Sequence, residues 1–135
     1  MELKLTKNLE TGIGIVDDQH AELIDAVNGL EDMREKVKDP AVMAETMDFL
    51  AGYCIMHFTT EESLMFNCKF PGTKEHEKEH KLFVEKFVEY KSKFEEEGFS
   101  DELFTEMTRF LKVWILHHVA TSDVEMGKFY KDNPA

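Results

Sequence analysis

The 135-residue chain is poor in cysteine, in basic residues and in long apolar runs, and each shortage argues against a class of protein. Its two cysteines, Cys54 and Cys68, are too few for the disulfide framework of a small secreted domain. No apolar run of about 18 residues is present to span a membrane, and no apolar stretch follows a basic N-terminal segment as in a signal peptide. These shortages predict a cytoplasmic protein.

Basic residues are outnumbered, since 16 Lys and Arg stand against 28 Asp and Glu, for a formal net charge of −12. Nucleic acids and anionic lipid surfaces are bound through clustered Lys and Arg, so neither is expected as a partner. Hydrophobic residues make up 42% and charged residues 33%, a balance typical of a globular domain. The length suits one domain, 1–135, of four helices of about 20 residues each.

Three short breaks divide the chain. At the first, Asp39 is placed to cap a helix that begins with Pro40. The second, 67–72, is expected to be a loop from which Thr73 caps the next helix. At the third, Gly98 suits a left-handed helix end and Ser100 a helix start.

Between these breaks, apolar residues recur every three or four positions, which predicts amphipathic helices. The expected helices cover about 17–37, 40–65, 73–96 and 101–120, with a short C-terminal segment near 124–130. Short loops make neighbouring helices antiparallel, so the fold class is all-α, an up-down-up-down four-helix bundle. Gly12 and Gly14 should break any helix before residue 17, so 1–16 is expected to be an extended arm along the bundle.

Histidines on the apolar faces carry the main functional signal. His57 and Glu61 are four residues apart, and so are His76 and His80. A step of four residues turns a helix by about 40°, so each pair projects from one face. The first pair continues an apolar stripe that includes Cys54, and the second begins one that includes Phe83 and Phe87, so we expect both pairs inside the bundle.

Two more helices contribute to the same pattern. His20 lies in the first predicted helix and His118 in the fourth, and Asp123 follows His118 by five residues. Five residues turn an ideal helix by about 140°, so a π-bulge or a break is predicted between His118 and Asp123 if both face the core. His117 lies about 100° from His118 and is expected at the surface or near, not in, the site.

Each pattern alone can arise without a metal, as a surface pair, a charged face or a satisfied core histidine. Together they indicate metal binding, because buried carboxylates without partners are very costly. The candidate ligands are His20, His57, Glu61, His76, His80, His118 and Asp123. Seven ligands are too many for one ion, and imidazole with carboxylate suits iron, zinc, copper or nickel. Cys54 is expected to be a buried hydrophobe and Cys68 a plain thiol in a loop.

Four segments in order resemble the hemerythrin family, in particular its single-domain bacterial members, the bacteriohemerythrins. They are Gly12-Ile13 with Asp17-Asp18-Gln19-His20, His57-Phe58-Thr59-Thr60-Glu61-Glu62, His76-Glu77-Lys78-Glu79-His80, and Trp114 to His118 with Asp123. Together they cover nearly the whole chain. An up-down-up-down bundle is also the topology of myohemerythrin, a member of this family.

The resemblance implies a non-haem di-iron centre. One iron would be held by His76, His80 and His118, and the other by His20 and His57, with an open position. Two carboxylates, Glu61 and Asp123, and an oxo or hydroxo group would bridge the two irons. Compared with carboxylate-rich di-iron bundles, this set has less ligand negative charge, which favours reversible two-electron chemistry over high-valent iron.

The implied function is reversible O2 binding for storage or delivery, with nitric oxide or small anions such as azide as other ligands. The expected O2 pocket wall is apolar and consists of Leu23, Phe58, Trp114 and Val119. The alternative is a sensor of O2, nitric oxide or redox state that acts on a separate, unidentified partner, but these 135 residues hold no signalling domain, which favours storage or delivery. No Ser/His/Asp set is present, so an enzyme is not expected.

Two residues depart from the pattern of the family. Leu5 stands where many bacterial members have a tryptophan in the arm, and the polar Thr121 lies near the bridging Asp123. Both predict easier entry of water and faster autoxidation of the centre.

Overall fold

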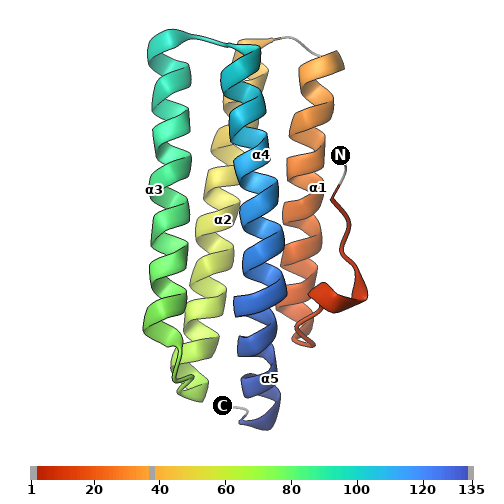
Figure 1. The fold of residues 1–135 in the computed structure, drawn as a ribbon, viewed down its shortest axis with the longest axis vertical. Helices are drawn as coiled ribbons and strands as arrows, with labels where there is room; N and C mark the ends of the chain where they lie inside the picture. Colours follow the sequence, from red (N-terminus) through yellow and green to blue (C-terminus); the bar gives the residue numbers. More distant parts are fainter. Residues whose placement is uncertain (1–2, 37–38, 134–135) are drawn as a thin grey trace.

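Four long helices lie side by side in the computed structural model, which describes residues 3–36 and 39–133 (Figure 1). They are α1 (Gly14–Lys36), α2 (Pro40–Cys68), α3 (Thr73–Glu97) and α4 (Asp101–His118). Each runs antiparallel to the next, and α1 also packs on α4, which closes the bundle. The predicted all-α up-down-up-down bundle is confirmed.

Local capping explains most helix ends. The Asp39 side chain accepts a hydrogen bond of 2.9 Å from the Ala41 N–H, ahead of Pro40. Gly98 ends α3 at a φ of 79°, and the Ser100 side chain accepts from the Leu103 N–H at 3.2 Å to start α4. The caps predicted at Asp39, Gly98 and Ser100 are confirmed.

Three boundary predictions were wrong. The loop predicted at 67–72 begins later, because α2 continues to Cys68, where a left-handed Lys69 ends it. Thr73 does not cap α3, since Gly72 occupies the N-cap and the Thr73 hydroxyl instead donates to the Phe70 carbonyl at 2.6 Å. Gly14 does not break a helix but begins α1, three residues before the predicted start.

The N-terminal arm is therefore shorter than predicted and ends at Ile13. It contains a single 3₁₀ turn, η1 (Lys7–Leu9), and runs beside α1 (Figure 1). Two hydrogen bonds join Leu3 to the Asn28 side chain in α1, at 3.0 and 2.8 Å. At its other end, the arm is bound to the Asp17 carboxylate, which accepts from the Thr11 N–H and hydroxyl at 2.8 Å each.

The C-terminal end of the bundle continues α4 without a turn. A π-helical segment, η2 (Val119–Asp123), leads into α5 (Val124–Asp132), which extends below α4 in Figure 1. None of the helices in the described residues combines the length and apolar character needed to cross a membrane.

Apolar side chains fill the bundle in two clusters. The larger cluster occupies most of its length and includes Leu30, Leu50, Phe83, Phe104 and Leu111. The smaller cluster consists of Ile13, Val16, Met65 and Met126. On α1, on α2 and across η2 into α5, polar residues separate members of the two clusters, and functional candidates lie at these positions.

Candidate metal centre

All seven candidate ligands lie in the polar layer between the two apolar clusters, and each is at most 2% exposed. On α1, His20 lies between Val16 and Leu23, and on α2, Glu61 lies between Phe58 and Met65. The surrounding core thus removes the layer from water on both sides. The structure brings together all seven candidate ligands.

The Glu61 carboxylate divides its two oxygens between two groups of histidines. Its Oε1 lies 2.9 Å from Nε2 of His80 and 3.4 Å from Nε2 of His76. Its Oε2 lies 3.1 Å from Nε2 of His57 and 3.3 Å from Nε2 of His20. One carboxylate therefore faces two separate clusters of nitrogen donors.

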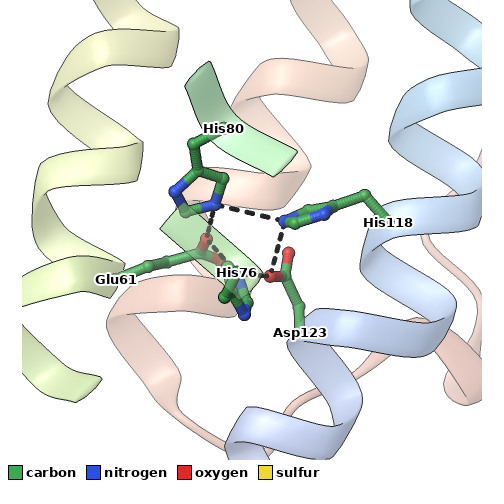
Figure 2. A group of neighbouring side chains, drawn as sticks. All are labelled: Glu61, His76, His80, His118 and Asp123. Atoms are coloured by element: carbon green, nitrogen blue, oxygen red, sulfur yellow. Dashed lines mark hydrogen bonds and ion pairs between the residues drawn. The ribbon is translucent and has the colours of Figure 1, made fainter. Parts of the chain in front are cut away.

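The Asp123 carboxylate is divided in the same way. Its Oδ1 lies 3.0 Å from Nε2 of His118 and 2.9 Å from Nε2 of His76. Dashed lines mark these contacts in Figure 2. Its Oδ2 lies 2.9 Å from Nε2 of His20. Two donor groups result, which share the carboxylates: a three-histidine group (His76, His80, His118) and a two-histidine group (His20, His57).

Many of these short approaches are not hydrogen bonds. Both oxygens of Glu61 and of Asp123, and Nε2 of His20 and His76, are buried without a hydrogen-bond partner among the described residues. Buried polar atoms are rarely left in this state, because each loses its hydration without compensation. Converging imidazole nitrogens and carboxylate oxygens are the donor set of a transition metal, so the layer fits a site for two metal ions.

Asp123 reaches the site because the helix widens ahead of it. The π-helix η2 lies directly between His118 and α5 and ends at Asp123, which is fully buried. Each π-turn accommodates one more residue than an α-turn, which brings position 123 round to the face of His118. The predicted interruption between these two residues is confirmed.

Polar residues that the sequence did not nominate surround the histidines. His57 Nδ1 lies 2.7 Å from Gln19 Oε1, His80 Nδ1 lies 2.9 Å from Glu62 Oε2, and His118 Nδ1 lies 2.7 Å from Glu79 Oε1. Carboxylate and amide oxygens only accept, so each Nδ1 donates its proton and each Nε2 faces the layer as a possible metal donor. Nε2 of His80 and Nε2 of His118 lie 3.2 Å from each other. The available signal was adjacency, since Gln19, Glu62 and Glu79 each neighbour a candidate ligand in the sequence.

The electrostatics of the layer follow from histidines and carboxylates buried together. Burial alone would lower the pKa of His20 and of His76, but the negative charges of the nearby Asp123 and Glu61 carboxylates outweigh it and raise these pKa values to about 9 and about 10. Burial would raise the pKa of both carboxyls, but the histidines hold both pKa values well below the usual range. A metal ion would thus have to displace protons from His20 and His76.

Aromatic side chains stack on the three-histidine group. The ring centroids of Phe58 and His80 are 4.0 Å apart, with an interplanar angle of 10°. Those of Trp114 and His118 are 4.3 Å apart, with an interplanar angle of 14°. Leu23 and Val119 are buried in the larger apolar cluster. Phe58 and Trp114 therefore restrain the imidazoles of one group, and the O2 pocket predicted from all four residues stays a prediction.

The remaining sequence candidates lie away from the metal layer or at its edge. His117 is exposed, as expected. Cys54 is a buried thiol whose pKa is raised by burial to about 12, and both cysteines are free. Leu5 packs half-buried against the larger cluster, whereas Thr121 is exposed and its hydroxyl donates to the His117 carbonyl at 2.7 Å. The effect of Leu5 and Thr121 on autoxidation stays a prediction.

Fold and cluster together define the class of protein: a four-helix bundle with a buried histidine and carboxylate site suited to two metal ions. The family model for the hemerythrin HHE cation binding domain matches residues 11–129 of this chain. The chain therefore belongs to the hemerythrin family.

Individual relatives agree with this assignment. A bacteriohemerythrin of Pseudomonas aeruginosa is 30% identical over 116 residues, which cover 86% of this chain and 73% of the relative. A bacteriohemerythrin of Aquifex aeolicus is 33% identical over 127 residues, covering 91% and 93%. Among solved structures, wild-type hemerythrin superposes with a TM-score of 0.84 at 26% identity, covering 95% of this chain and 97% of that one.

Proposed function

We propose that the protein binds molecular oxygen reversibly at a non-haem di-iron centre and serves oxygen storage or delivery. Two iron ions would be held by the seven ligands, with Glu61, Asp123 and a solvent-derived oxo or hydroxo group as bridges. The observation that carries the proposal is the division of each carboxylate between the two donor groups. Two ferrous ions, when bound, would supply the two electrons that reversible O2 binding needs.

The chain's own residues would make the two positions unequal. The three-histidine group offers three imidazole nitrogens and two carboxylate oxygens, while the two-histidine group offers two nitrogens and two oxygens. One fewer protein donor leaves room for an exogenous ligand at the position near His20 and His57. O2 is therefore proposed to bind on that side.

The apolar neighbours of the layer would protect the bound ligand. Leu23 and Val119 are each 2% exposed. Their side chains would exclude water, which promotes the irreversible release of bound oxygen in its reduced form. The same wall would admit nitric oxide or azide, which are small enough to share the position. No protein partner follows from these contacts.

The test is an optical spectrum of the iron-loaded protein, reduced without oxygen, then exposed to air and swept with inert gas over several cycles. Bands that appear with O2 and disappear on its removal would support the proposal. Bands that appear once and never reverse, or that respond only to nitric oxide, would favour a sensor or an enzyme instead.

His118→Ala and His117→Ala form a matched pair for this test. The two residues are neighbours in α4, but only His118 faces the metal layer. We expect His118→Ala to lose the bands and His117→Ala to keep them.

A further inference from the structure

The side chains that accept hydrogen bonds from the two donor groups differ in charge. On the three-histidine side, two imidazoles donate to carboxylates, His80 to Glu62 and His118 to Glu79. On the two-histidine side, His57 donates to the neutral amide of Gln19, and Nδ1 of His20 has no hydrogen-bond partner in the part of the chain that the structure describes. Among the described residues, the Nδ1 hydrogen bonds to carboxylates are thus on one side of the centre.

The two carboxylates are placed to keep this charge at little cost. The Glu62 and Glu79 side chains are 38% and 41% exposed, so each retains water on its outer side while it contacts a buried imidazole. By contrast, Gln19 is only 9% exposed. Its amide nitrogen lies 3.3 Å from the Thr60 hydroxyl, which fixes its oxygen toward His57.

Glu79 is also held in place from a second side. The Ser122 hydroxyl donates to Glu79 Oε1 at 2.7 Å, the same oxygen that accepts from His118. Because Ser122 lies in the π-helix one residue before Asp123, this bond joins the bridging carboxylate's segment to α3. Glu79, which orients the His118 ring, is therefore itself held in place by Ser122.

A carboxylate that accepts from Nδ1 makes the opposite imidazole nitrogen a stronger metal donor than an amide does. We propose that Glu62 and Glu79 are positioning residues that make the three-histidine group the high-affinity metal position, filled first, while Gln19 leaves the two-histidine group weaker. This inference rests on the proposed di-iron function, but it concerns the order and strength of metal binding rather than the binding of O2.

The test is a titration of the metal-free protein with Co²⁺ alone, followed by its absorption and by calorimetry. The wild type should take up two ions per chain in two steps of different affinity. His57→Ala should keep the tight step and His80→Ala should lose it, which assigns the tight step to the three-histidine group.

Glu62→Gln and Glu79→Gln should each weaken the tight step by about 10–100-fold and move the weak step by less than about threefold. Ser122→Ala should weaken the tight step by a smaller factor, because it frees Glu79 without removing its charge. Gln19→Glu should strengthen the weak step. The matched control is Glu77→Gln, an exposed glutamate of α3 that has no described contact with a ligand histidine, and it should change neither step.

Two equal steps in the wild type would overturn the inference. So would glutamate variants that weaken both steps equally, or that change the tight step by less than about threefold. A wild-type protein that binds fewer than two Co²⁺ ions would instead count against the proposed di-iron function, so the two failures are distinguishable. Thermal unfolding of each metal-free variant separates these effects from misfolding, since the proposed role requires an unchanged midpoint.

Discussion

Asp123 follows His118 by five residues, yet its Oδ1 lies 3.0 Å from Nε2 of His118. An α-helix would place these two side chains on different faces, about 140° apart. The π-helix η2 removes that difference and brings Asp123 opposite Glu61 across the bundle. The extra residue in this turn is therefore as necessary to the site as the carboxylate itself.

Deletion of Thr121 tests the role of the π-helix. Thr121 is exposed, so its loss should restore an α-helical turn without removing core volume, and Asp123 should rotate by about 100° out of the layer. We expect metal content to fall well below two ions per chain, measured by elemental analysis. Thr121→Ala keeps the residue count and should keep both ions, and a deletion variant with full metal content would contradict this account.

Substitution of Glu61 should lower the metal content of the protein more than substitution of one histidine. Glu61 faces both donor groups, whereas His57 belongs to one, so Glu61→Ala should weaken both ions and His57→Ala only the ion of the two-histidine group. Iron content should fall from about two per chain to near zero and to near one, respectively. Equal losses in the two variants would show that Glu61 does not bridge.

The metal-free protein should become less stable in alkaline solution. Its His20 and His76 pKa values are raised from 6.5 to about 9 and about 10, so the folded chain binds these protons more tightly than the unfolded chain. Their contribution to stability is complete below about pH 6.5 and is lost as the pH rises through about 9 to 10. Thermal unfolding midpoints should fall across that range.

The metal-loaded protein is the control for this pH series. Bound metal replaces the histidine protons, so its midpoints should depend less on pH in the same range. If the metal-free and metal-loaded proteins respond alike, the histidine protons are not the cause.

Gly127 in α5 should resist substitution. A Cβ at this position would lie 2.4 Å from the backbone oxygen of Thr11, and Thr11 is held by Asp17 and cannot move away easily. Gly127→Ala should therefore lower the free energy of unfolding by about 1–3 kcal/mol. Denaturant titration measures this value.

Gly52→Ala is the matched control, because Gly52 also lies inside a helix but a Cβ there meets nothing within 4 Å. Without a clash, alanine should raise the unfolding free energy by about 0.5–1 kcal/mol, since it favours the helix more than glycine does. A Gly127→Ala protein as stable as the wild type would show that the arm does not constrain α5.

Much of the fold was predictable because local chemistry determined it. The caps at Asp39 and Ser100 and the glycine at position 98 act through their own backbone neighbours, so sequence alone located them. The π-helix was predictable for a different reason: two groups five residues apart had to share one face. Gly14 and Cys68 were misplaced because glycine is tolerated in a first helical turn, and because a left-handed Lys69 gives no sequence signal for the end of a helix.

The ligands were predictable because histidines and carboxylates on the apolar faces of four helices would be very costly to bury without metal ions. Glu62, Glu79 and Ser122 were not, because partly exposed polar residues on a charged helix resemble an ordinary solvated face. Their role depends on distances between different helices, such as the 2.7 Å from Ser122 to Glu79, and no spacing within one helix encodes these.

The most direct test of the central claim is the amount of O2 taken up and returned by the iron-loaded, reduced protein, measured with an oxygen electrode. We predict one O2 bound per two irons, and the same amount released when the solution is deoxygenated. Uptake that continues with added reductant, or O2 that is not returned, would contradict reversible binding and would indicate that oxygen is consumed.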